Sequence, residues 1–366
     1  MTYITPGDKM KKLILLLSSM LILSSAYPQT PGLVKDGPGL RSTLSTETSG
    51  LFNSGDYKKL EELASQLRGN QERWPDGFWK LESFYKGLRS SYTVKNKKSD
   101  DDWLDIKMKL DDWISAYPNS ITPRVVLGYF MVDFAWHARG GGWANTVTEE
   151  GWNKFRDRLA EGKTALNEAR TDIKTDCPGW HDAMLVIALG QGWDRKEYDK
   201  FFDNAVSIYP TYYSLYFKKA YHLQRKWYGR TDNEWVAIAE NAVEKTSKDE
   251  GDTMYARICW NEITMKGYDS VFEDDSFSWE KMRKGFLDIE KKYPRSSWNL
   301  NNFCLFACVA KDRDTARELF KRIGDDPNIK TWTSKDTFNN WKKWAEKPTP
   351  PAAPAPATPA QDDAVK

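Results

Sequence analysis

Apolar residues recur at spacings of three and four along most of this 366-residue chain. One stripe occupies positions 103, 106, 110, 113 and 117, and the same spacing returns in four later segments: 198–209, 235–243, 279–293 and 300–308. This period places apolar side chains on one face of an α-helix. No run alternates with the period of two that a half-buried strand shows. The pattern predicts an all-α fold.

Three of the predicted helices end in a Tyr-Pro pair, at Tyr117, Tyr209 and Tyr293. Proline cannot continue a helix interior, so each pair marks a turn. A second predicted helix rich in aromatic residues follows each pair: 125–136, 212–227 and 298–309. The segment 125–136 is apolar nearly all round, which predicts a buried central helix.

A helix that ends in Tyr-Pro and its aromatic partner cannot bury their apolar faces alone, so such pairs must stack. Gly50–Leu67 and Asn301–Ile323 each read as a tetratricopeptide-like helix pair. The strict tetratricopeptide period is absent, because the Tyr-Pro pairs at 117, 209 and 293 are much farther apart than one such repeat. We therefore expect a tetratricopeptide-like helical-repeat solenoid of degenerate antiparallel helix pairs.

Three capping boxes suggest where helices begin. In this motif a side-chain oxygen accepts a hydrogen bond from a free backbone N–H, and an acid three residues later answers it. The candidates are Thr146 with Glu149, Asp194 with Glu197, and Thr231 with Glu234.

The segment 1–26 has the features of a signal peptide, with residues 1–9 as an upstream extension. Basic residues precede the apolar run Leu13–Leu23, and small residues at 24–26 offer a cleavage site. The run is too short to span a bilayer, which needs roughly 20 residues. We expect export to a periplasm or the medium, with no membrane span in the mature chain. An uncleaved N-terminal anchor is the alternative.

Composition divides the remainder into three parts. Residues 27–39 are expected to be a linker, residues 40–346 the helical-repeat domain, and residues 347–366 a disordered tail. Positions 348–360 contain only Pro, Ala and Thr, which favour an extended, solvated conformation.

Net charge and cysteine content exclude some functions. The chain carries +2, all of it within the predicted signal peptide, so the mature body is neutral. A neutral body has no electrostatic footprint for nucleic acid or an anionic membrane surface. Four cysteines in so long a chain do not form a disulfide framework, and the sequence leaves three pairings open.

Five short phrases appear in order between Trp79 and Trp344. They are WKLESFYKG at 79–87, AWHARG at 135–140, GQGW at 190–193, WYG at 227–229 and YAR at 255–257. Together they resemble a bacterial family of exported, tetratricopeptide-like proteins known as a domain of unknown function. The resemblance implies a helical-repeat fold and a scaffold or binding role, without a substrate or catalytic residue. The long Pro/Ala tail departs from it.

The sequence contains no catalytic, cofactor-binding or metal-binding motif, so it predicts no catalytic residue, cofactor or metal ion. The three histidines, at 137, 181 and 222, are too far apart for zinc-binding spacing. His137 and His181 each follow a Trp, so partly buried, hydrogen-bonded roles are expected for them. The chain has neither a phosphate-binding loop nor a nucleophile elbow. Gly140–Gly142 follows a predicted helix and reads as its C-cap.

One set of residues suggests a binding rim, because Trp, Gly and Arg recur together at predicted helix ends. The set comprises Trp136, Arg139, Gly140, Trp193, Arg195, Trp227, Tyr228 and Arg230. If the helices stack in register, these ends converge, and indoles and guanidinium groups could bind sugars or peptide groups. The alternative is structural, with Gly ending each helix, Trp wedged between helices and Arg paired with acids or carbonyls.

These observations favour a non-enzymatic scaffold outside the cytoplasm that binds a peptide or protein segment. The alternative is a glycan-binding or glycoside-cleaving all-helical protein, which the 17 tryptophans suggest. Cleavage would need an acid pair, with candidates Asp101, Asp102, Asp111, Asp112, Glu149 and Glu150. Most of these occupy first helical turns or polar faces, which is typical of caps and solvated charge. A purely structural role for the rim is a third reading.

Overall fold

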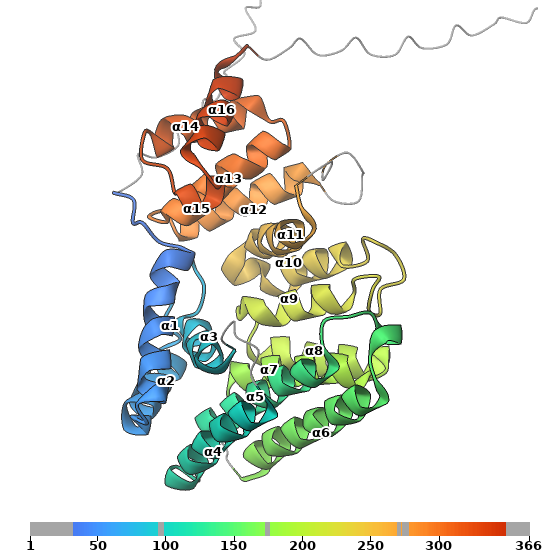
Figure 1. The fold of residues 1–366 in the computed structure, drawn as a ribbon. Coiled ribbons are helices and arrows are strands. Elements are labelled where there is room, and N and C mark those ends of the chain that lie inside the picture. Colours follow the sequence, from blue (N-terminus) through green and yellow to red (C-terminus); the bar gives the residue numbers. More distant parts are fainter. Residues whose placement is uncertain (1–31, 94–98, 173–175, 269–271, 273–277, 349–366) are drawn as a thin grey trace, which may run out of the picture.

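The computed structural model describes residues 32–93, 99–172, 176–268, 272 and 278–348 (Figure 1). The predicted signal peptide and tail residues 349–366 lie outside this part of the chain. Within it the regular structure is helical, with two isolated bridges and no strand. The all-α prediction is confirmed.

The N-terminal half contains these helices: α1 (Pro38–Asn53), α2 (Tyr57–Asn70), α3 (Lys80–Tyr92), α4 (Asp100–Ala116), α5 (Ile121–Arg139), the 3₁₀ helix η1 (Ala144–Thr146), α6 (Glu149–Asp172) and α7 (Pro178–Gln191). The C-terminal half contains α8 (Arg195–Ile208), α9 (Tyr213–His222), α10 (Val236–Glu250), α11 (Thr253–Lys266), α12 (Trp279–Lys292), α13 (Ser297–Val309), α14 (Arg313–Ile323), α15 (Ile329–Trp332) and α16 (Lys335–Glu346).

The predicted Tyr-Pro breaks are confirmed. Tyr117, Tyr209 and Tyr293 are the C-caps of α4, α8 and α12. Each N–H donates to the carbonyl four residues earlier, and the following proline ends the helix. The expected central helix is α5, in which residues 125–132 are all buried.

Of the three predicted capping boxes, one is confirmed in part, with one of its two hydrogen bonds formed, and two are wrong. The Asp194 carboxylate accepts a hydrogen bond from the Glu197 N–H at 2.9 Å and caps α8. At α6 the cap comes from Thr148, two residues after Thr146, because its hydroxyl accepts from Gly151 N–H at 3.0 Å. Helix α10 begins only at Val236, so Thr231 and Glu234 precede its first turn.

The order of packing follows the order of the chain. Each helix from α4 to α13 packs against the next one. Alternate helices α5, α7, α9 and α11 also pack against each other in sequence and form an inner row, and α3 packs against α5. Figure 1 shows α1–α3 beside this row, α4–α6 at one end of the molecule and α14–α16 at the other.

The start of the described chain is attached to its C-terminal part. Val34 N–H donates to Arg295 O at 2.8 Å, and Ser297 N–H donates to Val34 O at 3.2 Å. The Asp36 carboxylate then accepts from Trp298 N–H at 2.8 Å, at the beginning of α13. Part of the expected linker 27–39 is therefore bound to the helical body, and α1 begins at Pro38.

The core consists of two hydrophobic clusters. One extends from α1 to α7 and the other from α7 to α16, and Trp193 and Phe201 contact both. All four cysteines are buried and unpaired, so they act as small apolar residues. Among the described helices, none combines the length and apolar character needed to cross a membrane.

Candidate functional site

The turn before α3 is held in a conformation that requires glycine. Gly77 N–H donates to Trp74 O at 2.9 Å, and Phe78 N–H donates to the Asp76 carboxylate at 3.2 Å. Gly77 has φ of +95°, and a Cβ there would lie 2.6 Å from the Tyr293 ring. Both the backbone conformation and the close packing therefore exclude a side chain at position 77.

A buried arginine of α11 holds the same turn from below. Arg257 is 1% exposed, and it donates hydrogen bonds to Asp76 O and to Asn299 Oδ1. The Asn299 amide donates to Asp76 O as well, at 3.2 Å. Arg41 of α1 lies 3.1 Å from the Asp76 carboxylate. The turn thus connects α1, α11 and α13 and fixes the beginning of α3.

Helices α1 and α3 cross in very close contact at Gly87. A Cβ at this position would lie 1.9 Å from Thr48 Oγ1 and 2.4 Å from Ser45 O. The Ser45 hydroxyl also donates to Ser83 O at 2.9 Å. The absence of a side chain at residue 87 therefore sets the distance between the two helices.

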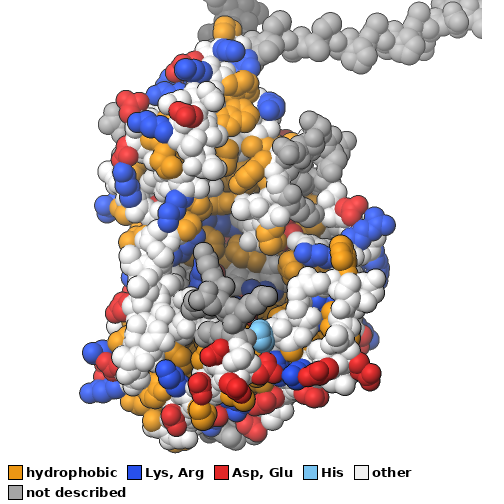
Figure 2. Space-filling view, in the orientation of Figure 1, with side chains coloured by type: hydrophobic (Ala, Val, Ile, Leu, Met, Phe, Trp, Pro, Cys, Tyr) orange, Lys and Arg blue, Asp and Glu red, His pale blue; other side chains and the backbone are white. Residues whose placement is uncertain are grey.

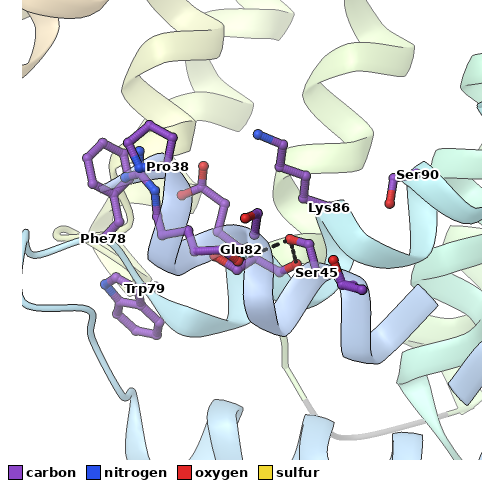
Figure 3. Close-up of a pocket in the computed structure, with 11 residues that line it drawn as sticks. Pro38, Ser45, Phe78, Trp79, Glu82, Lys86 and Ser90 are labelled. Atoms are coloured by element: carbon purple, nitrogen blue, oxygen red, sulfur yellow. Dashed lines mark hydrogen bonds between the residues drawn. The ribbon is translucent and has the colours of Figure 1, made fainter. Parts of the chain in front are cut away.

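Beside this crossing lies a hollow that we call the α3 cavity, made of two adjoining chambers of about 340 Å³ each. Glu82, Lys86 and Ser90, at successive turns of α3, line both chambers. The first chamber lies between α1 and α3, and Figure 3 shows Phe78 and Trp79 at one end of it and Ser90 at the other. Each chamber falls within the usual size range of ligand pockets.

The second chamber lies between α3 and the inner row. Its walls include Tyr129 of α5, Asp182 of α7, and Tyr212, Ser214 and Lys218 at and within α9. Figure 2 shows this face of the molecule hollowed between α1–α3 and the helices opposite, with Lys and Arg side chains inside the hollow.

Asp182 is a buried carboxylate whose hydrogen bonds come from two hydroxyl groups. Tyr129 Oη donates to it at 2.9 Å and Ser214 Oγ at 2.5 Å. The amine of Lys218 lies 3.8 Å away. These contacts offset the cost of burying the charge and connect α5, α7 and α9 at the wall of the cavity.

Glu82 has a different environment. Burial raises the pKa of its carboxyl group to about 7, opposed by nearby Arg41, Lys218 and Lys86 and reinforced by Asp182. No described residue forms a hydrogen bond or ion pair with this carboxyl group. Glu82 is therefore present in both protonated and ionised forms near neutral pH.

The charged groups around the cavity are of two kinds. Arg41 is paired with Asp76, and Arg89 binds Asp133 through two hydrogen bonds of 2.9 and 2.6 Å. Lys86 is exposed, and no ion pair joins it to any described residue. A Glu and a Lys four residues apart on a helix often pair in water, but Glu82 and Lys86 do not. Their hydrogen-bonding capacity is available to a ligand.

The predicted rim is partly assembled. The Trp136 and Trp227 rings meet edge to face with centroids 6.0 Å apart. A Cβ on Gly192 would lie 3.2 Å from Tyr228 Oη, so the ends of α5, α7 and α9 do approach each other. Arg195 pairs with Glu234 at 2.5 Å, and Arg230 N–H donates to the same carboxylate at 2.7 Å.

Most polar groups of the rim already have partners within the protein. Arg139 lies over the Trp136 and Trp152 rings and donates to the carbonyls of Gly140 and Gly142. Trp193 donates to the Gln191 side chain at 3.0 Å. These contacts agree with the structural alternative, and a binding role for the rim stays a prediction.

The acids considered for glycoside cleavage do not lie in the α3 cavity. All six are exposed, and Asp102 completes the capping box of Ser99 at the start of α4. Glu149 and Glu150 begin α6. The carboxyl groups that line the α3 cavity are instead those of Glu82 and Asp182, which belong to different helices.

Each of the three histidines contacts other side chains of the protein. His181 is buried and lies 3.2 Å from Asp176, while His137 lies 3.7 Å from Asp100. His222 is buried between the Tyr198 and Tyr228 rings. In the described part of the chain, no three His, Cys, Asp or Glu residues are grouped so that they could hold a metal ion.

Comparison with known proteins tests the family suggested by the sequence phrases. Residues 46–160 match the family model described as a domain of unknown function (DUF4034). This region runs from α1 into α6 and contains two of the five phrases. It includes Glu82 and Lys86, whereas Asp182 and Lys218 lie beyond it. No curated protein and no solved structure matches the chain. The match confirms a domain of unknown function and assigns no activity.

The α3 cavity was not predicted from the sequence, although two sequence patterns point to it. Asp182 directly precedes the apolar segment 183–189, where a carboxylate needs partners. Glu82, Lys86 and Ser90 form a polar row on a helix whose other side carries Phe84, Leu88 and Tyr92. Neither signal reveals that α7 and α9 face this row, because that depends on the tertiary fold.

Proposed function

We propose that this protein is a non-enzymatic, exported helical-repeat scaffold that binds a peptide or protein segment in the α3 cavity. The observation that carries the proposal is the pair Glu82 and Lys86. Both lack a partner among the described residues, in a cavity where Arg41, Arg89 and Asp182 are already engaged. Polar side chains that are not bound to other residues, on a fixed frame, are typical of ligand sites.

The packing order supports a tetratricopeptide-like architecture. Sequential helix pairs whose alternate members form an inner row are what stacked helical repeats produce. In such proteins the inner helices line a concave surface that binds extended segments. The α3 cavity lies against α5, α7 and α9 of this row.

The walls of the cavity suit a peptide. Phe78 and Trp79 in the first chamber and Tyr212 in the second supply aromatic surface. Trp79 is held by a hydrogen bond from its indole N–H to Thr211 O at 3.0 Å. A wall that is already ordered costs little entropy when the ligand binds.

The sequence of the segment 1–26 supports export, which is part of the proposal. Bacterial expression with a C-terminal tag, followed by fractionation, should place the protein in the periplasm or the medium. N-terminal sequencing should give a mature chain that begins at Tyr27. A chain that keeps this segment and stays in the membrane fraction would support the uncleaved anchor instead.

The binding proposal can be tested with a displayed peptide library and the purified mature chain. Peptides selected on the wild type should lose at least tenfold in affinity on the Lys86→Ala, Lys218→Ala double variant. The matched control is Lys200→Ala on α8, an exposed lysine away from the cavity. Selection of no peptide, or equal affinity for the double variant, would reject the cavity as the peptide site.

Glycan binding or cleavage is the second candidate, favoured by the stacked rim residues. Arg139 lies between two indoles, and the neighbouring Trp143 is 83% exposed. Indole faces are common sugar platforms. Soluble oligosaccharides should then quench tryptophan fluorescence, and Trp136→Ala or Trp193→Ala should abolish the quench. Cleavage would in addition require a pair of acids, and the appearance of shorter sugars from the same oligosaccharides measures it.

A further inference from the structure

Two lysines on different helices face the same chamber of the α3 cavity. Lys86 projects from α3 and Lys218 from α9, and both line the second chamber. No carboxylate among the described residues lies within 4 Å of the Lys86 amine, and only Asp182, at 3.8 Å, approaches that of Lys218. Two amines that line the same chamber, with Asp182 at 3.8 Å from one of them as the only described carboxylate within 4 Å, offer a site for an anionic group.

The charge balance indicates the charge of that group. The Arg41–Asp76 and Arg89–Asp133 pairs are each neutral and engaged. Among the residues that the structure describes, the remaining charged groups that line the cavity are Lys86, Lys218, Asp182 and Glu82. With Glu82 protonated these four sum to one positive charge, and with Glu82 ionised they sum to zero. A group with a single negative charge therefore balances the protonated form.

The available donors also favour a carboxylate over a phosphate. Both arginines, which would bind a phosphate through paired N–H groups, are held by aspartates. A phosphate dianion would leave uncompensated negative charge beside buried Asp182. The amines of Lys86 and Lys218 with the O–H of protonated Glu82 match the acceptor oxygens of one carboxylate.

We propose that the α3 cavity binds a carboxylate of its ligand between Lys86 and Lys218, with protonated Glu82 donating a third hydrogen bond. The proposal rests on the proposed peptide-binding function and names the chemical group that is recognised. Binding takes up a proton on Glu82, which faces Arg41 of α1, Asp182 of α7 and Lys218 of α9. Affinity should consequently fall as the pH rises above 7.

The probe for this proposal is N-benzoylglycine, whose aromatic ring suits Tyr129 and Tyr212 in the wall of the second chamber, compared with its uncharged amide. Calorimetric titration of the mature chain at pH 6 should give at least tenfold tighter binding for the carboxylate. Lys86→Gln and Lys218→Gln should each remove that advantage, while Lys200→Gln should keep it. Methyl phosphate should bind more weakly than acetate. Equal binding of the amide, or tighter binding of methyl phosphate, would overturn the proposal.

The pH dependence separates the role of Glu82 from simple charge attraction. Wild-type affinity for N-benzoylglycine should fall about tenfold between pH 6 and pH 8. Glu82→Gln keeps a neutral donor, so its affinity should stay constant over that range. A wild-type profile as flat as that of the variant would remove Glu82 from the site. Circular dichroism of each variant distinguishes lost binding from lost folding.

Two peptides distinguish the possible sources of the carboxylate. One has a free C-terminus and no acidic side chain, and the other has one aspartate and an amidated C-terminus. Preference for either assigns the source, and binding of neither overturns the proposal for peptides. Library peptides that bind in the cavity equally well without any carboxylate would leave the peptide-binding function intact and reject only the carboxylate. If N-benzoylglycine binds but no peptide does, the carboxylate site would stand and the peptide-binding function would be rejected.

Discussion

The guanidinium group of Arg257 on α11 donates a hydrogen bond to the backbone carbonyl of Asp76, which lies 181 residues earlier in the chain. Four aromatic rings surround this guanidinium at 5.2 to 6.0 Å: Phe78, Tyr213, Trp260 and Tyr293. A buried charge survives only where hydrogen bonds and ring faces replace water. This contact therefore determines how the α1–α3 unit lies against the inner row and how wide the α3 cavity is.

Replacement of Arg257 should loosen that attachment. We expect Arg257→Ala to lower the free energy of unfolding by about 3 kcal/mol, because it leaves a cavity and removes a donor from Asp76 O. Urea denaturation followed by circular dichroism measures the change. Arg225→Ala, at an exposed pair with Asp232, is the control and should change stability by less than about 0.5 kcal/mol. Similar values for both variants would contradict the role of Arg257.

Gly87 offers a test of the α1–α3 crossing. Gly87→Ala should destabilise the protein by about 2 kcal/mol or more, because its Cβ would overlap Thr48 Oγ1 and the backbone of Ser45. Gly50→Ala on α1 is the matched control, since nothing lies within 4 Å of its Cβ. That change should stabilise the exposed helix by about 0.5 to 1 kcal/mol. Thermal unfolding should thus move in opposite directions for the two variants.

Glu82 should make stability depend on pH in a defined direction. Its pKa is raised in the folded protein to about 7 from 4.5, so the folded state binds more protons between these values. The contribution of Glu82 to stability is complete below pH 4.5 and is lost as the pH rises through 7. The Glu82→Gln variant should gain about 1 to 2 kcal/mol relative to the wild type between pH 4.5 and pH 8, a figure reduced for partial solvent exposure.

The control for that measurement is Glu47→Gln, an exposed residue of α1. The stability difference between wild type and this variant should stay level across the same range. If the stability difference between wild type and Glu82→Gln is also constant over this pH range, the Glu82 carboxyl group titrates as it would in water.

His222 should act in the opposite sense at acid pH. Burial lowers its pKa to about 3 from 6.5, helped by nearby Lys219. The contribution of the neutral His222 to the free energy of unfolding is complete above pH 6.5. It is lost as the pH falls toward 3, because only the unfolded chain then takes up the proton. His222→Phe should remove about 3 kcal/mol of this acid-induced loss. Urea denaturation at pH 7 and at pH 4 gives the loss of unfolding free energy for each protein. An equal loss in the wild type and in His222→Phe would contradict the lowered pKa of His222.

The phenylalanine variant should fold at neutral pH. Neither ring nitrogen of His222 has a hydrogen-bond partner among the described residues, and the ring stacks on Tyr198 at 3.7 Å. An apolar ring can keep that stacking without leaving a polar partner unsatisfied.

The helices themselves were readable from local pattern. Stripes such as 103–117 and breaks such as Tyr117-Pro118 predict elements whose ends the structure confirms. Helix starts were less predictable, since Thr148 replaces Thr146 as the cap of α6. Several short polar side chains stand before that helix, and the sequence does not indicate which one meets the free N–H groups.

The site was harder to predict, because its residues are distant in sequence. Glu82 and Lys86 belong to the matched region 46–160, whereas Asp182 and Lys218 come from later helices. The predicted rim residues share a recurring local phrase, and the structure brings some of them together, as with Trp136 and Trp227. The recurring phrase of Trp, Gly and Arg showed where helices end. It did not show which polar side chains would remain without a partner in the folded protein.

The sequence by itself determined the helical class, the breaks between helices and which face of each helix is buried, because these depend on spacings of three and four and on proline geometry. Only the tertiary structure decided that α3 would lie across the inner row, held by Arg257 and a glycine without space for a Cβ. That arrangement depends on contacts between residues far apart in the chain, and it alone places Glu82, Lys86 and Lys218 around one cavity.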